Sequence, residues 1–237
     1  MYAFFRIGLI ISLFVTTIAT QQALAQSGHK LPDSVSIHPP SYLALGDSYT
    51  IGESVDPAKR FPNQTVQILA SKGLFIGNPI YLAKTGWTSL DLLDALKRKA
   101  LDGKYDIISL LIGVNDQYQD LDTAGYRERF SILLGEAIQL AGSEPKHVFV
   151  LSIPDYSVTP FGKNSPIIHK EIVEFNRINQ AVSKYYQVNY IDITPISQSA
   201  FSVTQYTAID GLHPSGEQYR EWAKLLASAI EKNLFQL

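Results

Sequence analysis

The expected fold is decided by one stretch of the sequence, YLALGDSY at residues 42–49. Its first half is apolar without polar alternation, which is typical of a strand covered on both faces of a parallel sheet. Its second half places Gly46, Asp47 and Ser48 directly after that strand. Ligands of open α/β sheets bind outside the carboxyl ends of the strands, so these residues are the first candidates for a functional site.

Further short apolar runs follow along the chain, at residues 80–83, 107–112, 147–153 and 188–191. Segments with helical spacing lie between them and after them. These are expected from Thr88 or Ser89 to near Gly103, around residues 130–140, over residues 167–186, and from Ser215 to about residue 230. This alternation predicts a single α/β domain with a parallel sheet and right-handed crossovers.

Two of the expected helices have a clear apolar face. The segment 167–186 is expected to turn six side chains inward, those of Ile168, Ile172, Phe175, Ile178, Val182 and Tyr185. The last helix is expected to start with a capping box formed by Ser215 and Gln218. Its buried face would consist of Tyr219, Trp222, Ala223, Leu226 and Ile230.

The first 25 residues resemble a signal peptide rather than part of the domain. Arg6 precedes an apolar run over residues 7–15, and the segment ends in Ala23-Leu24-Ala25. The run is shorter than the roughly 20 apolar residues that a membrane-spanning helix needs. We expect cleavage there, a linker over residues 26–40, a single folded domain over residues 41–237, and a secreted or periplasmic bacterial protein without an integral membrane segment. Retention of residues 1–25 as an N-terminal anchor is the alternative.

Composition excludes several classes of function. The chain of 237 residues has 20 basic and 22 acidic residues and a net charge of −2, and its basic residues are dispersed. This argues against a nucleic-acid partner. There is no cysteine, which excludes disulfides, thiolate metal sites, a cysteine nucleophile and a lipid-bearing cysteine.

Polar motifs follow the other expected strands as well. Thr85-Gly86-Trp87 follows the second run, Gly113-Val114-Asn115-Asp116 follows the third, and Asp210-Gly211-Leu212-His213 precedes the last helix. Each motif alone would be an ordinary turn. Their common position at strand ends, or just beyond the last strand, predicts one site that combines a nucleophile, a base, an acid and hydrogen-bond donors.

These four blocks, in this order, resemble the GDSL or SGNH family of hydrolases over roughly residues 41–232. The resemblance implies a three-layer α/β/α, flavodoxin-like fold with a five-stranded parallel sheet. It also implies that Gly86 and Asn115 are oxyanion-hole donors. Tyr49 stands where the family name has leucine, a difference expected to affect substrate fit rather than reaction type.

The residue types indicate the same chemistry. A serine hydroxyl needs a base to become nucleophilic, so Ser48 is the expected nucleophile and His213 the base. Asp210 can orient the imidazole from the same loop. The backbone N–H of Ser48 is expected to join Gly86 and Asn115 in the oxyanion hole. Four other histidines (His29, His38, His147 and His169) are weaker candidates, and Asp47 and Asp116 are expected to be structural.

The expected activity is hydrolysis of carboxylic esters through an acyl-enzyme, with no cofactor and no metal. Position 50 is threonine, so the nucleophile elbow of the usual α/β-hydrolases is absent. Tyr49 and Trp87, with Tyr118 and Phe161, are candidate substrate contacts or ordinary aromatics, and residues 156–166 form a candidate rim loop. Short or medium acyl esters, lysophospholipids or aryl esters are the expected substrates. A carbohydrate O-acetyl esterase is the alternative, and an inactive binding module is a third possibility. Oligomeric state is left open.

Overall fold

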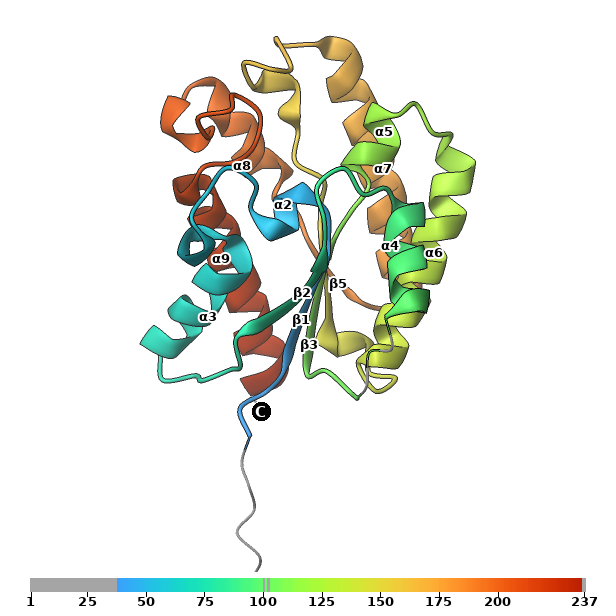
Figure 1. Cartoon of the computed structure of the whole chain (residues 1–237), viewed down its shortest axis with the longest axis vertical. Coiled ribbons are helices and arrows are strands. Elements are labelled where there is room, and N and C mark those ends of the chain that lie inside the picture. Colours follow the sequence, from blue (N-terminus) through green and yellow to red (C-terminus); the bar gives the residue numbers. More distant parts are fainter. Residues whose placement is uncertain (1–37, 100, 102, 236–237) are drawn as a thin grey trace, which may run out of the picture. The chain divides into compact units, whose positions relative to one another are not determined.

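A computed structural model describes residues 38–99, 101 and 103–235; the predicted signal peptide and most of the predicted linker lie outside this part of the chain. The compact unit that starts at Pro39 contains a five-stranded sheet in the order β2-β1-β3-β4-β5 (Figure 1). Every pairing in it is parallel. The strands are β1 Tyr42–Gly46, β2 Pro79–Ala83, β3 Ile107–Leu111, β4 Val148–Leu151 and β5 Asn189–Ile191. This confirms the predicted fold class and the positions of the five strands.

Helices cover both faces of the sheet, giving the predicted three layers (Figure 1). On one face α3 (Phe61–Ser71) packs against α9 (Gly216–Ile230). On the other face α6 (Thr123–Leu140) contacts both α4 (Ser89–Arg98) and α7 (Pro166–Tyr185). The central strands β1, β3 and β4 are buried throughout, whereas the edge strands β2 and β5 are partly exposed.

Helix α3 was not predicted, because polar residues occupy part of its inner face. Gln64 and Thr65 are buried beside Phe61 and Leu69. The Gln64 amide donates to the carbonyls of Lys59 and Gly216, and the Thr65 hydroxyl donates to the carbonyl of Phe61. These bonds satisfy the buried polar atoms, so the helix packs without the continuous apolar stripe that a sequence pattern requires.

The predicted helices are observed, with three differences: one in a helix end, one in a cap and one in a buried face. Thr88 caps α4 in a reciprocal capping box with Asp91, and the helix ends at Arg98, before the expected end near Gly103. Ser215 caps α9 by accepting from the N–H of Gln218, but no reciprocal bond from the Gln218 side chain occurs within the described residues. Tyr185 was predicted to face inward and is 81% exposed. The inward row of α7 continues from Val182 in a step of four to Tyr186, which packs against the core.

Several short elements complete the chain. The short α-helices are α2 (Ser48–Ile51), α5 (Val114–Tyr118) and α8 (Thr194–Gln198). Single 3₁₀ turns occur at Pro57–Lys59, Pro145–His147, Tyr156–Val158, Ser199–Phe201 and Thr204–Tyr206, and a π turn at Glu231–Phe235 closes the described chain. Within the described residues, no helix has the length and apolarity required to cross a membrane.

Strand register aligns the loops that carry the polar motifs. Gly46 of β1 is paired with Ala83 of β2 and with Leu111 of β3. The chain therefore leaves all three strands at the same level, and α2, the Thr85–Gly86 turn and α5 start side by side at this edge. The sequence blocks around Ser48, Gly86 and Asn115 are brought together by this register.

Gly113, which connects β3 to α5, offers a test of this arrangement. Its φ is +123°, and a Cβ there would lie 2.3 Å from the hydroxyl of Tyr126. That hydroxyl is held between two acceptors, Oδ1 of Asn179 at 2.7 Å and the carbonyl oxygen of Ile112 at 3.0 Å. Gly113→Ala should therefore lower the free energy of unfolding by about 2–4 kcal/mol, measured by chemical denaturation.

Gly135 of α6 is the matched control. A Cβ at Gly135 would meet no atom within 4 Å. Gly135→Ala should raise stability by about 0.5–1 kcal/mol, because alanine loses less backbone entropy in a helix. Equal effects of the two substitutions would contradict the assigned packing around Gly113.

Candidate active site

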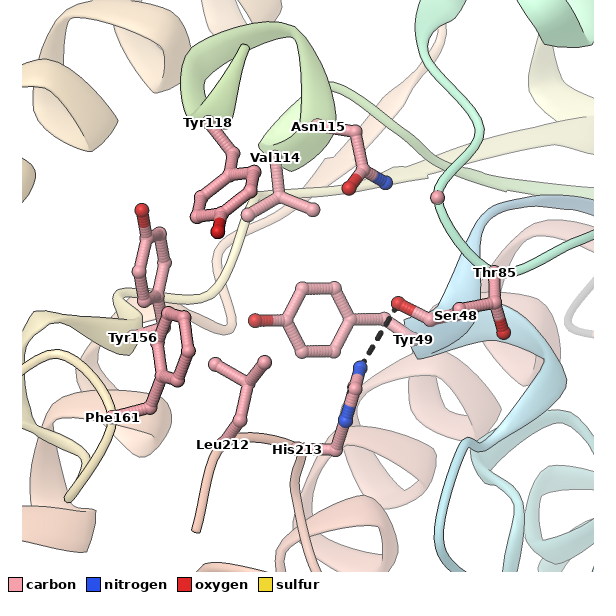
Figure 2. Close-up of a pocket in the computed structure, with 11 residues that line it drawn as sticks. Ser48, Tyr49, Thr85, Val114, Asn115, Tyr118, Tyr156, Phe161, Leu212 and His213 are labelled. Atoms are coloured by element: carbon pink, nitrogen blue, oxygen red, sulfur yellow. Dashed lines mark hydrogen bonds between the residues drawn. The ribbon is translucent and has the colours of Figure 1, made fainter. Parts of the chain in front are cut away.

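Ser48, His213 and Asp210 form a continuous line of hydrogen bonds (Figure 2 shows the first of them). The Ser48 Oγ lies 3.1 Å from Nε2 of His213, and Nδ1 of His213 lies 2.6 Å from Oδ2 of Asp210. Ser48 is the first residue of α2 and is only 5% exposed. The structure thus brings the three residues together in the order nucleophile, base and acid that the sequence predicts.

Asp210 is held by four donors. Its Oδ1 accepts from the backbone N–H groups of Leu212 and His213, each at 2.9 Å. Its Oδ2 accepts from the Ser54 hydroxyl at 2.6 Å in addition to the imidazole. Partial burial disfavours the charged form, but these hydrogen bonds outweigh it and lower the pKa of Asp210 to about 2. The carboxylate is therefore charged at any pH at which an imidazole base is functional.

Tyr49 supports the imidazole from the side. Its ring meets the His213 ring edge-on at a centroid distance of 5.5 Å and contacts Trp222 of α9 at 6.3 Å. Tyr49 is buried and also lines the cavity next to Ser48. A large aromatic residue at this position thus packs against the His213 ring and also forms part of the cavity wall.

The three predicted oxyanion-hole residues, Ser48, Gly86 and Asn115, all line one cavity. Within the described residues, neither the N–H of Ser48 nor that of Gly86 donates to a protein acceptor. Gly86 has a φ of +81° in the turn closed by the Trp87 N–H bond to the Lys84 carbonyl. The side-chain amide of Asn115 donates to the carbonyl of Trp87 at 2.9 Å, which fixes its orientation and leaves its second N–H available.

A cavity of about 290 Å³ opens at this point. In Figure 2 the side chains of Val114, Tyr118, Tyr156, Phe161 and Leu212 lie to the left of Ser48, Asn115 lies above it, and Thr85 lies to its right. The ring of Phe161 lies 6.2 Å from that of Tyr118 and 6.3 Å from that of Tyr156. The lining residues are Ser48, Tyr49, Thr85, Gly86, Val114, Asn115, Tyr118, Tyr156, Phe161, Leu212 and His213.

The aromatic candidates differ in their positions. Tyr49, Tyr118 and Phe161 line the cavity, and the predicted rim segment supplies Tyr156 and Phe161. Trp87 is not among the lining residues; its side chain packs against the core and its carbonyl orients Asn115. Val114 and Leu212, which the sequence reading did not single out, lie inside the quoted motifs. Their position between polar residues of the motifs was the sequence evidence that could have identified them as cavity residues.

Asp116 and Asp47 are both fully buried beside the site, but their surroundings differ. Asp116 accepts from the N–H and the hydroxyl of Ser89 and pairs with Arg129 at 3.1 Å. It joins α5 to α4 and α6. Asp47 caps α2 through Oδ1, which accepts from the N–H of Tyr49, while its Oδ2 has no partner within the described part of the chain. Burial raises the pKa of Asp47 to about 8.

A second Asp–His pair lies beyond the cavity. Nδ1 of His169 is 2.6 Å from Oδ2 of Asp155, which is buried directly before the rim segment, whereas the His169 side chain is half-exposed. The pair ties the rim segment to α7. His147 ends a 3₁₀ turn, and His29 lies outside the described residues. Within the described residues, no group of three or more His, Asp or Glu side chains is arranged to hold a metal ion.

Asp47 makes stability depend on pH. Its pKa rises from 3.8 in an open chain to about 8 on folding. The stabilising effect of its protonated form is complete below the lower value and is lost as the pH rises towards the higher one. Asp47→Asn keeps the cap and cannot ionise, so its stability relative to wild type should increase by on the order of 2–5 kcal/mol across this interval. Urea unfolding at several pH values measures the difference.

Asp116→Asn is the control, because it removes a buried charge that is paired with Arg129. It should lose stability by about 3 kcal/mol or more. A constant stability difference between Asp47→Asn and wild type at all pH values would show that Asp47 does not titrate as its burial requires.

Several solved structures resemble this chain in fold. A lipase/acylhydrolase from Enterococcus faecalis is 23% identical, with a TM-score of 0.66 over 81% of this chain and 96% of its own. A variant of an acetyl xylan esterase from Geobacillus stearothermophilus is 17% identical, with a TM-score of 0.62 over 84% and 98%. A psychrotrophic esterase from Pseudoalteromonas is 15% identical, with a TM-score of 0.62 over 83% and 100%.

No curated protein sequence matches the chain. At these identities the solved structures establish the shared fold. The sequence model of the GDSL-like Lipase/Acylhydrolase family, in contrast, matches residues 44–221, which include all four motif blocks. This chain therefore belongs to the GDSL-like lipase/acylhydrolase family.

Proposed function

We propose that this protein is a serine hydrolase that cleaves carboxylic esters through an acyl-enzyme on Ser48. The observation that carries the proposal is the hydrogen-bond line from Ser48 through His213 to Asp210 at the wall of an open cavity. A protein that only bound esters would have no need for a serine, a base and a charged acid in this geometry. Family membership supports a hydrolase of the esterase and lipase type.

The first half of the reaction follows from the positions of the groups. His213 Nε2 takes the proton of the Ser48 hydroxyl as Oγ attacks the ester carbonyl carbon. The negative charge that develops on the carbonyl oxygen faces the N–H groups of Ser48 and Gly86 and the amide of Asn115. Asp210 keeps the imidazole in the tautomer that presents Nε2 to Ser48 and stabilises the imidazolium.

The second half regenerates the enzyme. The imidazolium gives its proton to the leaving alcohol as the carbon–oxygen bond breaks, leaving the acyl group on Ser48. Water then enters, His213 takes a proton from it, and the resulting attack releases the acid and restores the serine hydroxyl. Every proton in this cycle moves through the same Nε2 atom.

The cavity favours a short or medium acyl group. Its volume of about 290 Å³ is at the lower end of the range for small-molecule sites, which starts near about 300 Å³. Its apolar wall of Val114, Tyr118, Tyr156, Phe161 and Leu212 offers no charged partner for a substrate. Esters of short to medium fatty acids, including lysophospholipids and aryl esters, match these properties.

A carbohydrate O-acetyl esterase is the second candidate. Tyr118 and Phe161 are about half-exposed and present rings at the cavity mouth, where a sugar could stack. The likeness to a protein described as an acetyl xylan esterase is consistent with this reading at the level of fold. Both candidates use the same chemistry and differ in the leaving group.

We also propose that the protein is exported, with residues 1–25 acting as a cleaved signal peptide. The charged start, the short apolar run and the small residues before Gln26 support this proposal. Mass spectrometry of the protein recovered from the cell envelope or the medium would show whether the chain starts near residue 26.

The nucleophile is tested by Ser48→Ala with p-nitrophenyl esters from acetyl to palmitoyl. The substitution should lower kcat by about 10⁴-fold or more without loss of folding, because no other group can form the acyl-enzyme. Ser183→Ala is the control, since Ser183 is a buried serine of α7 that does not line the cavity and whose hydroxyl has no partner among the described residues. Near-normal turnover by Ser48→Ala would sink the proposal.

The apolar wall is tested by Phe161→Ala. Removing this ring should lower kcat/KM for octanoyl esters by about 10-fold, because acyl methylenes lose burial, and should change acetyl ester hydrolysis by less than about 2-fold. Tyr185→Ala, at an exposed aromatic of α7, controls for general effects. If acetyl and octanoyl esters are affected equally, the wall does not bind the acyl chain. Higher activity on acetylated xylan than on any p-nitrophenyl ester would favour the second candidate.

A further inference from the structure

The turn that follows α2, residues 52–55, is attached directly to the nucleophile. We call this segment the α2 turn. The N–H of Gly52 and the N–H of Glu53 both donate to the carbonyl of Ser48. Gly52 has a φ of +65°, and a Cβ there would lie 2.5 Å from the side chain of Arg60. The turn is therefore fixed relative to Ser48 by backbone bonds and by close packing.

Ser54 reaches from this turn to the acid. Its hydroxyl donates to Oδ2 of Asp210 at 2.6 Å, the same oxygen that pairs with the imidazole of His213. The other two donors to Asp210 come from its own loop, so Ser54 is the one contact from a distant segment within the described residues. A short bond to a charged oxygen is among the stronger types of hydrogen bond.

Ser54 adopts an unusual backbone conformation for a residue with a side chain. Its φ is +64°, in the left-handed region that favours glycine. A β-branched or bulky residue would be strained there, and glycine would have no hydroxyl. In this conformation the serine closes the turn and also places its hydroxyl within hydrogen-bond distance of Asp210.

Glu53 makes a corresponding contact on the opposite side of the cleft. Its carboxylate accepts from the hydroxyl of Thr85, the residue before Gly86. Thr85 and Gly86 both line the cavity. Adjacent residues of one turn thus hold the loop of the acid and the loop of a proposed oxyanion donor.

We propose that the α2 turn positions the two sides of the catalytic site, with Ser54 fixing Asp210 against His213 and Glu53 fixing the loop of Gly86. The proposal rests on the function proposed above. Ser54 and Glu53 are positioning residues, because they act through Asp210 and Thr85. Ser54 also shares the negative charge of Asp210, so removing its hydroxyl leaves more charge to attract the imidazolium proton.

The other ionisable groups around the His213–Asp210 pair belong to several elements. Burial raises the pKa of Tyr49 and Tyr219, which stay neutral in the assay range. Burial also opposes ionisation of Asp155, but hydrogen bonds from Ser157, His169 and Gln198 lower its pKa, so this group is constant as well. The groups that share a cavity or charge contact with the pair are Tyr49, Tyr118, Asp155, Tyr156, Tyr206 and Tyr219.

The test compares Ser54→Ala and Ser54→Gly in the full chain. Alanine keeps the Cβ and glycine relieves the left-handed backbone, so an effect common to both comes from the hydroxyl. By NMR, the titration midpoint of the His213 imidazole should move to higher pH by about 0.3–1 unit in both variants. With a p-nitrophenyl ester, kcat should fall about 3- to 10-fold, with KM within about 2-fold of wild type.

Ser143 supplies a matched control. It is an exposed serine after α6 with a φ of +66°. Ser143→Ala and Ser143→Gly should change neither the imidazole titration nor kcat. Glu53→Ala should lower kcat about 3-fold or more without moving the His213 midpoint. Glu53→Gln keeps an acceptor for the Thr85 hydroxyl, so its kcat should be close to that of wild type.

An unchanged His213 midpoint in both folded Ser54 variants would overturn the inference, and so would an equal shift in the Ser143 variants. This readout does not need turnover. Failure of the proposed function, seen as ester hydrolysis that is absent or independent of Ser48, is therefore distinguishable from failure of the inference.

Discussion

The parallel register of three strands is the constraint on which the site depends. Gly46, Ala83 and Leu111 are paired across β1, β2 and β3, so the segments that follow them start at one level. A one-residue slip would turn each buried side chain of a strand to the other face of the sheet and would separate Ser48 from the Gly86 turn. The buried apolar residues of β1 and β3 thus fix the relative positions of the motif residues as well as the fold.

Two buried carboxyl groups close to Ser48 differ in how well their oxygens are hydrogen-bonded. Asp116 is buried with Arg129 and two donors from Ser89, and it links three helices. Asp47 is equally buried, yet one of its oxygens has no partner among the described residues. Its other oxygen caps α2, the helix that begins with Ser48, by accepting from the N–H of Tyr49. The capping bond accounts for an aspartate at position 47. The packing of the surrounding core offsets the free-energy cost of burying its carboxyl group.

The sequence predicts those features of the fold and the site that depend on local residue patterns. Five strand positions and the pairing of Asp210 with His213 follow from apolar runs and from a spacing of three residues. Helix α3 was not predicted because Gln64 and Thr65 interrupt the apolar stripe of its inner face. They can lie inside the core because their polar atoms are hydrogen-bonded there. The contact between Ser54 and Asp210 joins positions 156 residues apart and needs a left-handed serine, and no pattern reports such a conformation. Trp87, a candidate substrate contact or ordinary aromatic in the sequence, is not among the residues that line the cavity, and its carbonyl accepts from Asn115.

The central claim is that Ser48 is a nucleophile activated by His213. A p-nitrophenyl alkylphosphonate tests it directly, because attack by the serine oxygen on phosphorus expels p-nitrophenolate and leaves a stable adduct. The account predicts one equivalent of p-nitrophenolate per chain, one adduct located on Ser48 by mass spectrometry, and none in Ser48→Ala or His213→Ala. An adduct on another residue, or undiminished labelling of the Ser48→Ala protein, would contradict it.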